Sequence, residues 1–301
     1  MKRFKLVYNP RSGDASFKGR LDRVIGQLQK AGIEVHPWRL GRECVVEDLI
    51  RDMKESKADE FYDGILVSGG DGTISNTVSA MIKHDFRIPI GVFPYGTAND
   101  FATYLGIPKN VDDCCDIIIN GNTRAIDVGK VNDKHFINVV SAGMIMGIPH
   151  NTDTQLKNAL GKIAYYIKGL EELPKITAFK AEIVMKDKTV VEEELLLILV
   201  LNSSAAGGFG KLAPDAAVDD GALDVVAIRS GNLAELLGVF IKIMTGDVQE
   251  DPRIHRFQAE SMKLFCDPIC PTDVDGEKGP ALPLEISVLK QEIEIFVPYV
   301  V

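Results

Sequence analysis

The sequence predicts an α/β fold in two parts: an N-terminal, Rossmann-like parallel α/β domain and a C-terminal antiparallel β-sandwich domain. Two observations indicate this. In the first third of the 301 residues, short apolar runs alternate with segments of helical periodicity, as in a parallel sheet covered by helices on both faces. Beyond about residue 124, strand-like runs follow one another with turn residues between them, as in an antiparallel sheet. We therefore expect domains of residues 1–124 and 125–286.

The first domain contains four predicted strands, each followed by a loop and a helical segment. The strands are FKLVYN, IEVHPW, GILVS and IPIGVFP, and the helices are expected over 17–31, 45–57, 73–84 and 101–105. Short, continuous apolar runs of this kind are typical of strands buried on both faces. A cleft between this domain and the next is the default place for a site.

The second domain is predicted as a series of strands. They are AIDVGKVN, KHFINVVSAG, ITAFKAEIVMK, TVVEEELLLILVLN, ALDVVAIR, SMKLFC and PLEISVL. Two helical stretches interrupt them, LKNALGKIAYYIKGLEEL and NLAELLGVFIKIMTG. The first has an apolar stripe and three lysines, so it could rest on a membrane surface. A core-facing helix is the alternative, because two glutamates dilute its basic face.

Composition and charge exclude several classes of protein. Hydrophobic residues make up 46% of the chain and charged residues 26%, the balance of a soluble globular protein. The net charge of −9 argues against nucleic acid as a partner. The same charge means that contact with an anionic membrane would need a local basic patch. The most apolar run, Leu195–Leu201, is too short to span a bilayer, and the N-terminus is not a signal peptide. A cytoplasmic location is therefore expected.

The cysteines do not predict a disulfide framework or a zinc site. Their number, five, is odd in a chain without an export signal. Cys114 and Cys115 are adjacent, and Cys266 and Cys270 have three residues between them; neither spacing is typical of a tetrahedral site. Buried thiols are the favoured interpretation.

Three strand-to-helix loops carry glycines: NPRSG (9–13), SGGDGT (68–73) and FPYGTAND (93–100). All three would lie at the carboxyl ends of parallel strands, where open α/β sheets bind ligands. Glycines let backbone N–H groups approach an anion, and a following helix adds the positive end of its dipole. Together the loops favour a phosphate site over isolated turns. The usual phosphate-binding patterns, GxxxxGK[ST] and GxGxxG after a strand, are absent.

Asp71 lies in the middle of the second loop and needs an explanation. A carboxylate beside a bound phosphate is repelled unless a cation lies between them, or unless it accepts hydrogen bonds from a sugar or the backbone. Mg²⁺, a ribose hydroxyl and a helix N-cap all remain open for Asp71.

Two acidic clusters lie in the second domain, APDAAVDDGALD (213–224) and TDVDGE (272–277). Phosphoryl transfer needs metal-borne charge neutralisation and a base that orients the hydroxyl. In the second cluster Asp275 and Glu277 are close enough for one to accept a proton while the other assists. Solvated Asp-Gly hairpin turns are the alternative for both clusters.

These motifs together resemble one known family. VSGGDGTISNTVSAM, GVFPYGTANDFATYLGIP, KLAPDAAVDDGALDVV and DVDGE are similar, in the same order, to the bacterial diacylglycerol kinase-like lipid kinases. These are relatives of the eukaryotic diacylglycerol and sphingosine kinases. The resemblance covers nearly the whole chain. It implies ATP- and Mg²⁺-dependent phosphorylation of a lipid hydroxyl, most simply of diacylglycerol to phosphatidic acid, by an enzyme that meets its substrate at the inner face of the membrane. It also implies that the tail, about 287–301, returns to the first domain.

The resemblance also implies roles for individual residues. Asp275 and Glu277 would supply the general base. Asp220 would hold a structural Mg²⁺ together with the backbone oxygens of Ala217 and Ala222. The nucleotide would be bound by Asn9, Pro10, Arg11, Ser12, Gly13, Gly69, Gly70, Asp71, Gly72, Thr73, Ile74, Ser75 and Thr97.

The chain departs from the family pattern at two places. Members often have a threonine after the second strand, where this chain has Arg39-Leu40-Gly41. They also often have Asn-Glu after GGDGT, where this chain has Ser75-Asn76. Two other functions share some of the motifs: an NAD kinase, and a nucleotide-binding regulatory protein without catalysis. The lipid acceptor, a homodimer and the membrane-docking surface cannot be read from the sequence.

Overall fold

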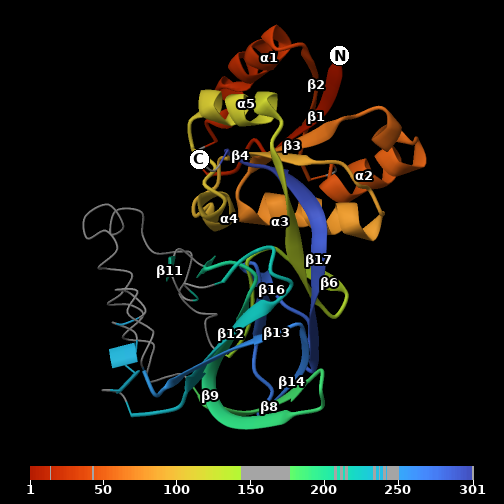
Figure 1. Ribbon diagram of the computed structural model, residues 1–301. Helices are drawn as coiled ribbons and strands as arrows, with labels where there is room; N and C mark the ends of the chain where they lie inside the picture. The colour runs from red at the N-terminus through yellow and green to blue at the C-terminus, as the bar shows by residue number, and fades with distance from the viewer. Residues whose placement is uncertain are drawn as a thin grey trace.

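The computed structural model describes residues 1–299 except 14, 43, 144–176, 207–208, 211–212, 214–215, 233–234, 237, 240–241 and 243–250. Figure 1 shows a part that contains the helices above a part built of strands. This arrangement confirms the predicted fold class, a parallel α/β domain followed by an antiparallel β domain. The predicted helix over 156–173 lies outside the described residues, as does most of the one over 232–246.

The first part is a parallel sheet with the strand order β2-β1-β3-β4. Figure 1 shows α1 and α5 on one side of this sheet and α2 and α3 on the other. The strands are β1 (Lys2–Tyr8), β2 (Ile33–Arg39), β3 (Gly64–Gly69) and β4 (Ile90–Pro94). The helices are η1 (Phe17–Gly19), α1 (Leu21–Lys30), α2 (Val46–Glu55), η2 (Ala58–Glu60), α3 (Asp71–Lys83), α4 (Asp100–Tyr104) and α5 (Val111–Asn120).

Burial follows the sequence pattern in this part. All six residues of β3 and all five of β4 are buried, as expected for central strands covered on both faces. Helix α5 was not predicted from the sequence. Its two ends nevertheless have common capping residues. At the N-terminus the Asn110 side chain accepts a hydrogen bond from the backbone N–H of Asp112, and at the C-terminus Gly121 ends the helix with a φ of +74°.

The second part consists of antiparallel strands, which continue the hydrogen-bonded network of the first part except for β10 and β11, which pair with each other in a separate sheet. These strands are β5 (Thr123–Val131), β6 (Lys134–Phe136), β7 (Val139–Gly143), β8 (Phe179–Met185), β9 (Val190–Leu201), β10 (Ala205–Ala206), β11 (Phe209–Gly210), β12 (Leu223–Arg229), β13 (Ile254–Ala259), β14 (Ser261–Asp267), β15 (Thr272–Val274), β16 (Glu277–Lys278) and β17 (Leu284–Phe296). A separate hydrophobic core lies between strands of this part, among them β8, β9 and β14.

Strand β17 joins the two parts. It pairs antiparallel with β14 and β5, and its end pairs parallel with β4 through Ile295 and Ile90. Its register shifts between Leu289 and Ile293, where Gln291 adopts a φ of +49°. Figure 1 shows this long strand running from the lower part into the upper one.

The single strand predicted over 134–143 is two strands in the structure. β6 ends at Phe136 and β7 begins at Val139. The backbone N–H groups of residues 137–139 donate to the Asp275 carboxylate instead of to a neighbouring strand. The interruption is therefore caused by a side chain that lies more than 130 residues further along the chain. No helix among the described residues has the length and apolar character needed to cross a membrane.

Candidate active site

The three glycine loops meet at the carboxyl ends of β1, β3 and β4. A Cβ atom on Gly96 would lie 2.2 Å from the Cα atom of Gly70, and one on Gly13 would lie 2.6 Å from the carbonyl oxygen of Tyr95. These distances are far below ordinary contact, so the backbones touch only because side chains are absent. The structure thus brings together the loops that the sequence predicted to converge.

The start of α3 has the features of an anion site. The helix begins at Asp71. Its N-cap residue is Gly70, so no side chain at the N-cap accepts a hydrogen bond from the first N–H groups of the helix. The N–H groups of Asp71 and Gly72 donate to no acceptor among the described residues. A Cβ on Gly72 would meet no atom within 4 Å, so open space lies beside these N–H groups. Free N–H groups at the positive end of a helix dipole suit a phosphate.

The Asp71 carboxylate contacts another helix. It accepts hydrogen bonds from the backbone N–H groups of Asp100, at 3.3 Å, and Phe101, at 3.1 Å. These are the first residues of α4, so Asp71 caps α4 rather than its own helix. The sequence left Mg²⁺, a ribose hydroxyl and a helix N-cap open for Asp71, and the structure shows an N-cap, although of α4 and not of the helix that Asp71 begins. Contact between Asp71 and a nucleotide stays a prediction.

Asn99 fixes the third loop, and the sequence did not single it out. Its side chain accepts from the N–H of Gly96 at 2.7 Å and donates to the carbonyl of Gly96 at 2.9 Å. Asn99 is buried and has a φ of +56°, a conformation that asparagine tolerates better than most residues. Thr97, between the two, is exposed to solvent.

The remaining predicted nucleotide residues differ in their surroundings. The Asn9 side chain accepts from the N–H of Arg11 and so shapes the first loop. Ile74 is fully buried in the core of the first domain, so any contact with a nucleotide would come from its backbone. The Ser75 hydroxyl donates to Asp275 at 2.7 Å.

Asp275 is held at several points. One carboxylate oxygen accepts from the N–H groups of Asn138 and Val139, and the other from the N–H of Ile137 and the hydroxyl of Ser75, at 2.7 to 3.0 Å. Burial raises the pKa of Asp275, although the hydrogen bonds act in the opposite direction. Glu277, in contrast, is exposed and makes no side-chain hydrogen bond or ion pair with any described residue.

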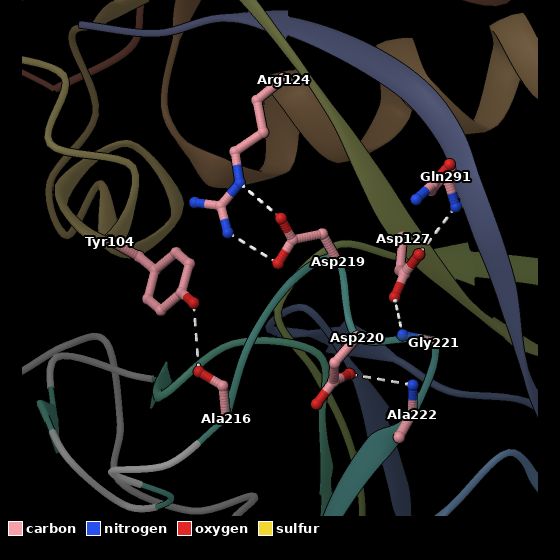
Figure 2. Close-up of polar contacts among 9 residues, drawn as sticks. All are labelled: Tyr104, Arg124, Asp127, Ala216, Asp219, Asp220, Gly221, Ala222 and Gln291. Carbon is pink, nitrogen blue, oxygen red and sulfur yellow. Dashed lines mark hydrogen bonds and ion pairs between the residues drawn. The ribbon is translucent and has the colours of Figure 1, made fainter. Parts of the chain in front are cut away.

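The first acidic cluster, residues 213–224, lies on a loop that the side chains of Tyr104, Arg124 and Asp127 hold in place (Figure 2). Arg124 forms a bidentate ion pair with Asp219, at 2.8 and 2.6 Å. The buried Asp127 carboxylate accepts from the N–H of Gly221, at 2.6 Å, and from the N–H of Gln291, at 2.7 Å. Asp127 therefore ties the loop to the bulge of β17. The sequence analysis missed this residue, although a carboxylate inside the apolar run AIDVGKV was a visible signal.

The residues predicted for Mg²⁺ lie on this loop. Asp220 is exposed, and its carboxylate accepts from the N–H of Ala222 at 3.0 Å and from the Gln258 side chain at 3.3 Å. Ala217 lies between two residues whose carbonyls are occupied, because Ala216 accepts from Tyr104 and Val218 accepts from Asp127.

The donor set at this loop fits a hydrated Mg²⁺. Among the described residues no three His, Cys, Asp or Glu side chains gather at one point. An ion here would therefore be held by one carboxylate, Asp220, together with backbone oxygens and water. Oxygen ligands and retained waters are what Mg²⁺ prefers. Asp220, Ala217 and Ala222 stay the predicted ligands.

The comparisons with known proteins agree with these observations. The family model for the diacylglycerol kinase catalytic domain matches residues 3–131, and that for the YegS C-terminal NAD kinase beta sandwich-like domain matches residues 138–297. The chain belongs to the diacylglycerol kinase family. A diacylglycerol kinase from Bacillus subtilis is 36% identical over 299 residues, which cover 99% of this chain and 97% of that protein. One from Staphylococcus carnosus is 35% identical over 297 residues, covering 99% and 95%.

A solved structure is also similar. The crystal structure of a diacylglycerol kinase from Bacillus anthracis superimposes with a TM-score of 0.79 at 26% identity, and covers 99% of this chain and 97% of that one. Membership of the diacylglycerol kinase family confirms the resemblance drawn from the four motifs, and makes the chain a kinase. The individual site residues stay predictions, now with a described geometry.

Four of the five cysteines are buried or half-buried, and Cys44 is exposed. Cys114 and Cys115 are buried in α5, and burial raises the pKa of each to about 12. Both therefore stay protonated thiols at neutral pH and pack as apolar side chains. Cys266 and Cys270 are half-buried, with a hydrogen bond between their thiols.

Proposed function

We propose that this kinase transfers the γ-phosphate of ATP, with Mg²⁺, to the hydroxyl of diacylglycerol and forms phosphatidic acid. One observation carries the proposal: the hydrogen bond from Ser75 to Asp275. Ser75 lies on α3 four residues after Asp71, at the open N-terminus suited to phosphate. Asp275 begins the acidic turn. The bond therefore holds a phosphate site and a pair of carboxylates next to one another, as transfer to a hydroxyl requires.

The two carboxylates take different parts in the proposed reaction. A carboxylate has about four lone-pair sites, and those of Asp275 accept four hydrogen bonds. Asp275 therefore cannot accept a proton without losing a donor. Glu277 is exposed and lacks any such partner among the described residues. We assign Glu277 as the general base and Asp275 as the residue that holds the turn.

The proposed step is an in-line transfer. The lipid oxygen attacks the γ-phosphorus, its proton passes to Glu277, and the bond to the β-phosphate oxygen breaks to release ADP. The N–H groups of Asp71 and Gly72 would bind phosphate oxygens as charge builds on them. Mg²⁺ bound with the nucleotide would neutralise phosphate charge, whereas an ion at Asp220 would stiffen the loop held by Asp127.

The test is an assay of the purified protein with ATP, Mg²⁺ and diacylglycerol in mixed micelles, with phosphatidic acid as the product measured. Glu277→Gln should lower kcat by about 100-fold or more. The control is Glu294→Gln, at an exposed glutamate of β17 whose side chain accepts a hydrogen bond from Thr123. This variant should keep full activity. Full activity of Glu277→Gln would contradict the assignment of the base.

The assay also tests a second phosphate acceptor, because the description of the C-terminal family model refers to NAD kinase. The same preparation is incubated with NAD in place of lipid. Phosphorylation of NAD without transfer to diacylglycerol would replace the proposed function, and transfer to another lipid would change only the acceptor. Nucleotide binding without transfer to any acceptor would indicate a regulatory protein.

We further propose that the protein is cytoplasmic and acts as a peripheral protein at the inner face of the membrane, because diacylglycerol resides in the bilayer. Co-sedimentation with vesicles that contain diacylglycerol and an anionic lipid tests this. Binding should weaken as salt rises if a basic patch contributes. Failure to sediment under conditions where phosphatidic acid forms would exclude stable association.

A further inference from the structure

We propose that Ser75 is a positioning residue: its hydroxyl fixes the acidic turn of the second domain relative to the phosphate-binding start of α3. The inference rests on the proposed function, because it concerns the base of that reaction. It differs from the role expected from the sequence, in which Ser75 contacts the nucleotide.

The turn itself is a tight hairpin. Asp273 pairs with Lys278, and Val274 pairs with Glu277. Asp275 and Gly276 are therefore the two loop residues, and both have positive φ, +48° and +86°. Such a two-residue turn has little freedom, so the position of Asp275 determines that of Glu277, two residues later.

Asp275 is anchored from two directions. Its own N–H donates to the carbonyl of Val139, and its carboxylate accepts the N–H groups of residues 137–139. These bonds tie the hairpin to the segment between β6 and β7. The fourth bond to the carboxylate is the one from Ser75, and it comes from α3. Among the hydrogen bonds between Asp275 and the described residues, it alone reaches the helix that begins at the phosphate site.

Ser75 is well suited to this role. It is 7% exposed, so its hydroxyl is shielded from water that would compete for the bond. It lies in a regular helix that starts at Asp71, and a helix transmits position with little deformation. Because the acceptor is a carboxylate, the bond belongs to the stronger, charge-assisted class. Loss of the hydroxyl would leave one lone pair of a buried carboxylate without a donor.

The kinetic consequence follows from this geometry. A misplaced Glu277 slows proton removal in the transition state, whereas the N–H groups that would bind phosphate at Asp71 and Gly72 stay where they are. Ser75 should therefore affect kcat and not the affinity for nucleotide. A contact between Ser75 and the nucleotide would have the opposite effect.

The experiment compares Ser75→Ala with Ser75→Thr, which keeps the hydroxyl, in the full-length protein. Ser75→Ala should lower kcat about tenfold, as expected for loss of one hydrogen bond to a charged group. Its KM for ATP, and its dissociation constant for ADP, should stay within about twofold of wild type. Ser75→Thr should recover most of kcat. The matched control is Ser79→Ala, one turn further along α3, which should change none of these values.

Three results would overturn the proposal: an unchanged kcat in Ser75→Ala, a weaker ADP affinity with an unchanged kcat, or no recovery in Ser75→Thr when that variant is folded. If Ser75→Ala does not fold, Ser75→Cys, with a similar volume and a weaker donor, takes its place and should show a reduced kcat. Failure of the proposed function can be distinguished from failure of this inference about Ser75. In the former case the wild-type protein itself would form no phosphatidic acid, or Glu277→Gln would stay active.

Discussion

The guanidinium of Arg124 and the carboxylate of Asp219 form two parallel hydrogen bonds between the start of β5 and the acidic loop. The ion pair holds the pKa of Arg124 above its usual value. It also distinguishes two neighbouring carboxylates, because Asp219 is engaged whereas Asp220 is exposed beside it (Figure 2). The adjacent acids of the DDG motif therefore have different surroundings and should have different functions.

We predict that Asp220→Ala removes the stabilisation of the protein by Mg²⁺, whereas Asp219→Ala keeps it. Asp219→Ala should instead lower the free energy of unfolding by about 1 kcal/mol, since the pair with Arg124 is partly exposed and screened. The two variants are compared by thermal unfolding at low and at saturating Mg²⁺. An equal response of wild type and Asp220→Ala to Mg²⁺ would exclude Asp220 as a ligand.

The glycines of the converging loops should respond differently to alanine. Gly96→Ala places a Cβ 2.2 Å from the Cα of Gly70, so the backbones must separate at a cost of about 1–3 kcal/mol, the range for overpacking. A Cβ on Gly72 meets no atom within 4 Å, and alanine favours a helix by up to about 1 kcal/mol over glycine. Gly72→Ala should therefore keep or raise the stability of the protein.

The same Gly72→Ala variant should raise KM for ATP about tenfold, because the methyl group occupies space beside the free N–H groups that would bind phosphate. Urea unfolding and steady-state kinetics on both variants separate the two effects. A Gly72→Ala enzyme with normal KM would show that phosphate does not approach this position.

The features of the fold and of the candidate site that the sequence predicted are those set by residues close together along the chain. Local patterns predicted the four parallel strands and the loops that meet at Gly70 and Gly96. Both the alternation of strands with helices and the glycines of the loops can be recognised within short stretches of sequence. Contacts between distant segments were not predictable. The Ser75 hydroxyl looked like part of the nucleotide site, and its partner Asp275 lies 200 residues away. The strand over 134–143 was expected to be continuous for the same reason.

Asp71→Ala should destabilise the protein by about 1–3 kcal/mol, the range for leaving buried donors without a partner, because the N–H groups of Asp100 and Phe101 lose their acceptor. The matched control is Asp22→Ala. Asp22 also lies in the first turn of a helix, but it is exposed and should contribute only about 0.3–1 kcal/mol through the helix dipole. The free energies of unfolding of the two variants are compared by chemical denaturation. Equal losses in both variants, with a raised KM for ATP in Asp71→Ala, would favour a nucleotide-binding role instead.

A last prediction concerns acid and the ion cluster of Glu193. The side chains of Arg229 and His255 contact Glu193, at 2.9 and 2.6 Å, and the hydrogen bond from Arg229 is the main cause of its lowered pKa. A carboxyl group with a pKa lowered by folding adds stability above its unfolded value, about 4.3, and loses this contribution as the pH falls through the folded value.

Glu193→Gln should therefore be less stable than wild type at neutral pH, and the difference should shrink as the pH falls from about 5 toward 3. The control is Glu192→Gln, at the neighbouring exposed position of β9, which should match wild type throughout. Urea midpoints measured across this pH range decide the matter. A difference between wild type and Glu193→Gln that does not change with pH would mean that the side chain stabilises β9 by packing rather than by its charge.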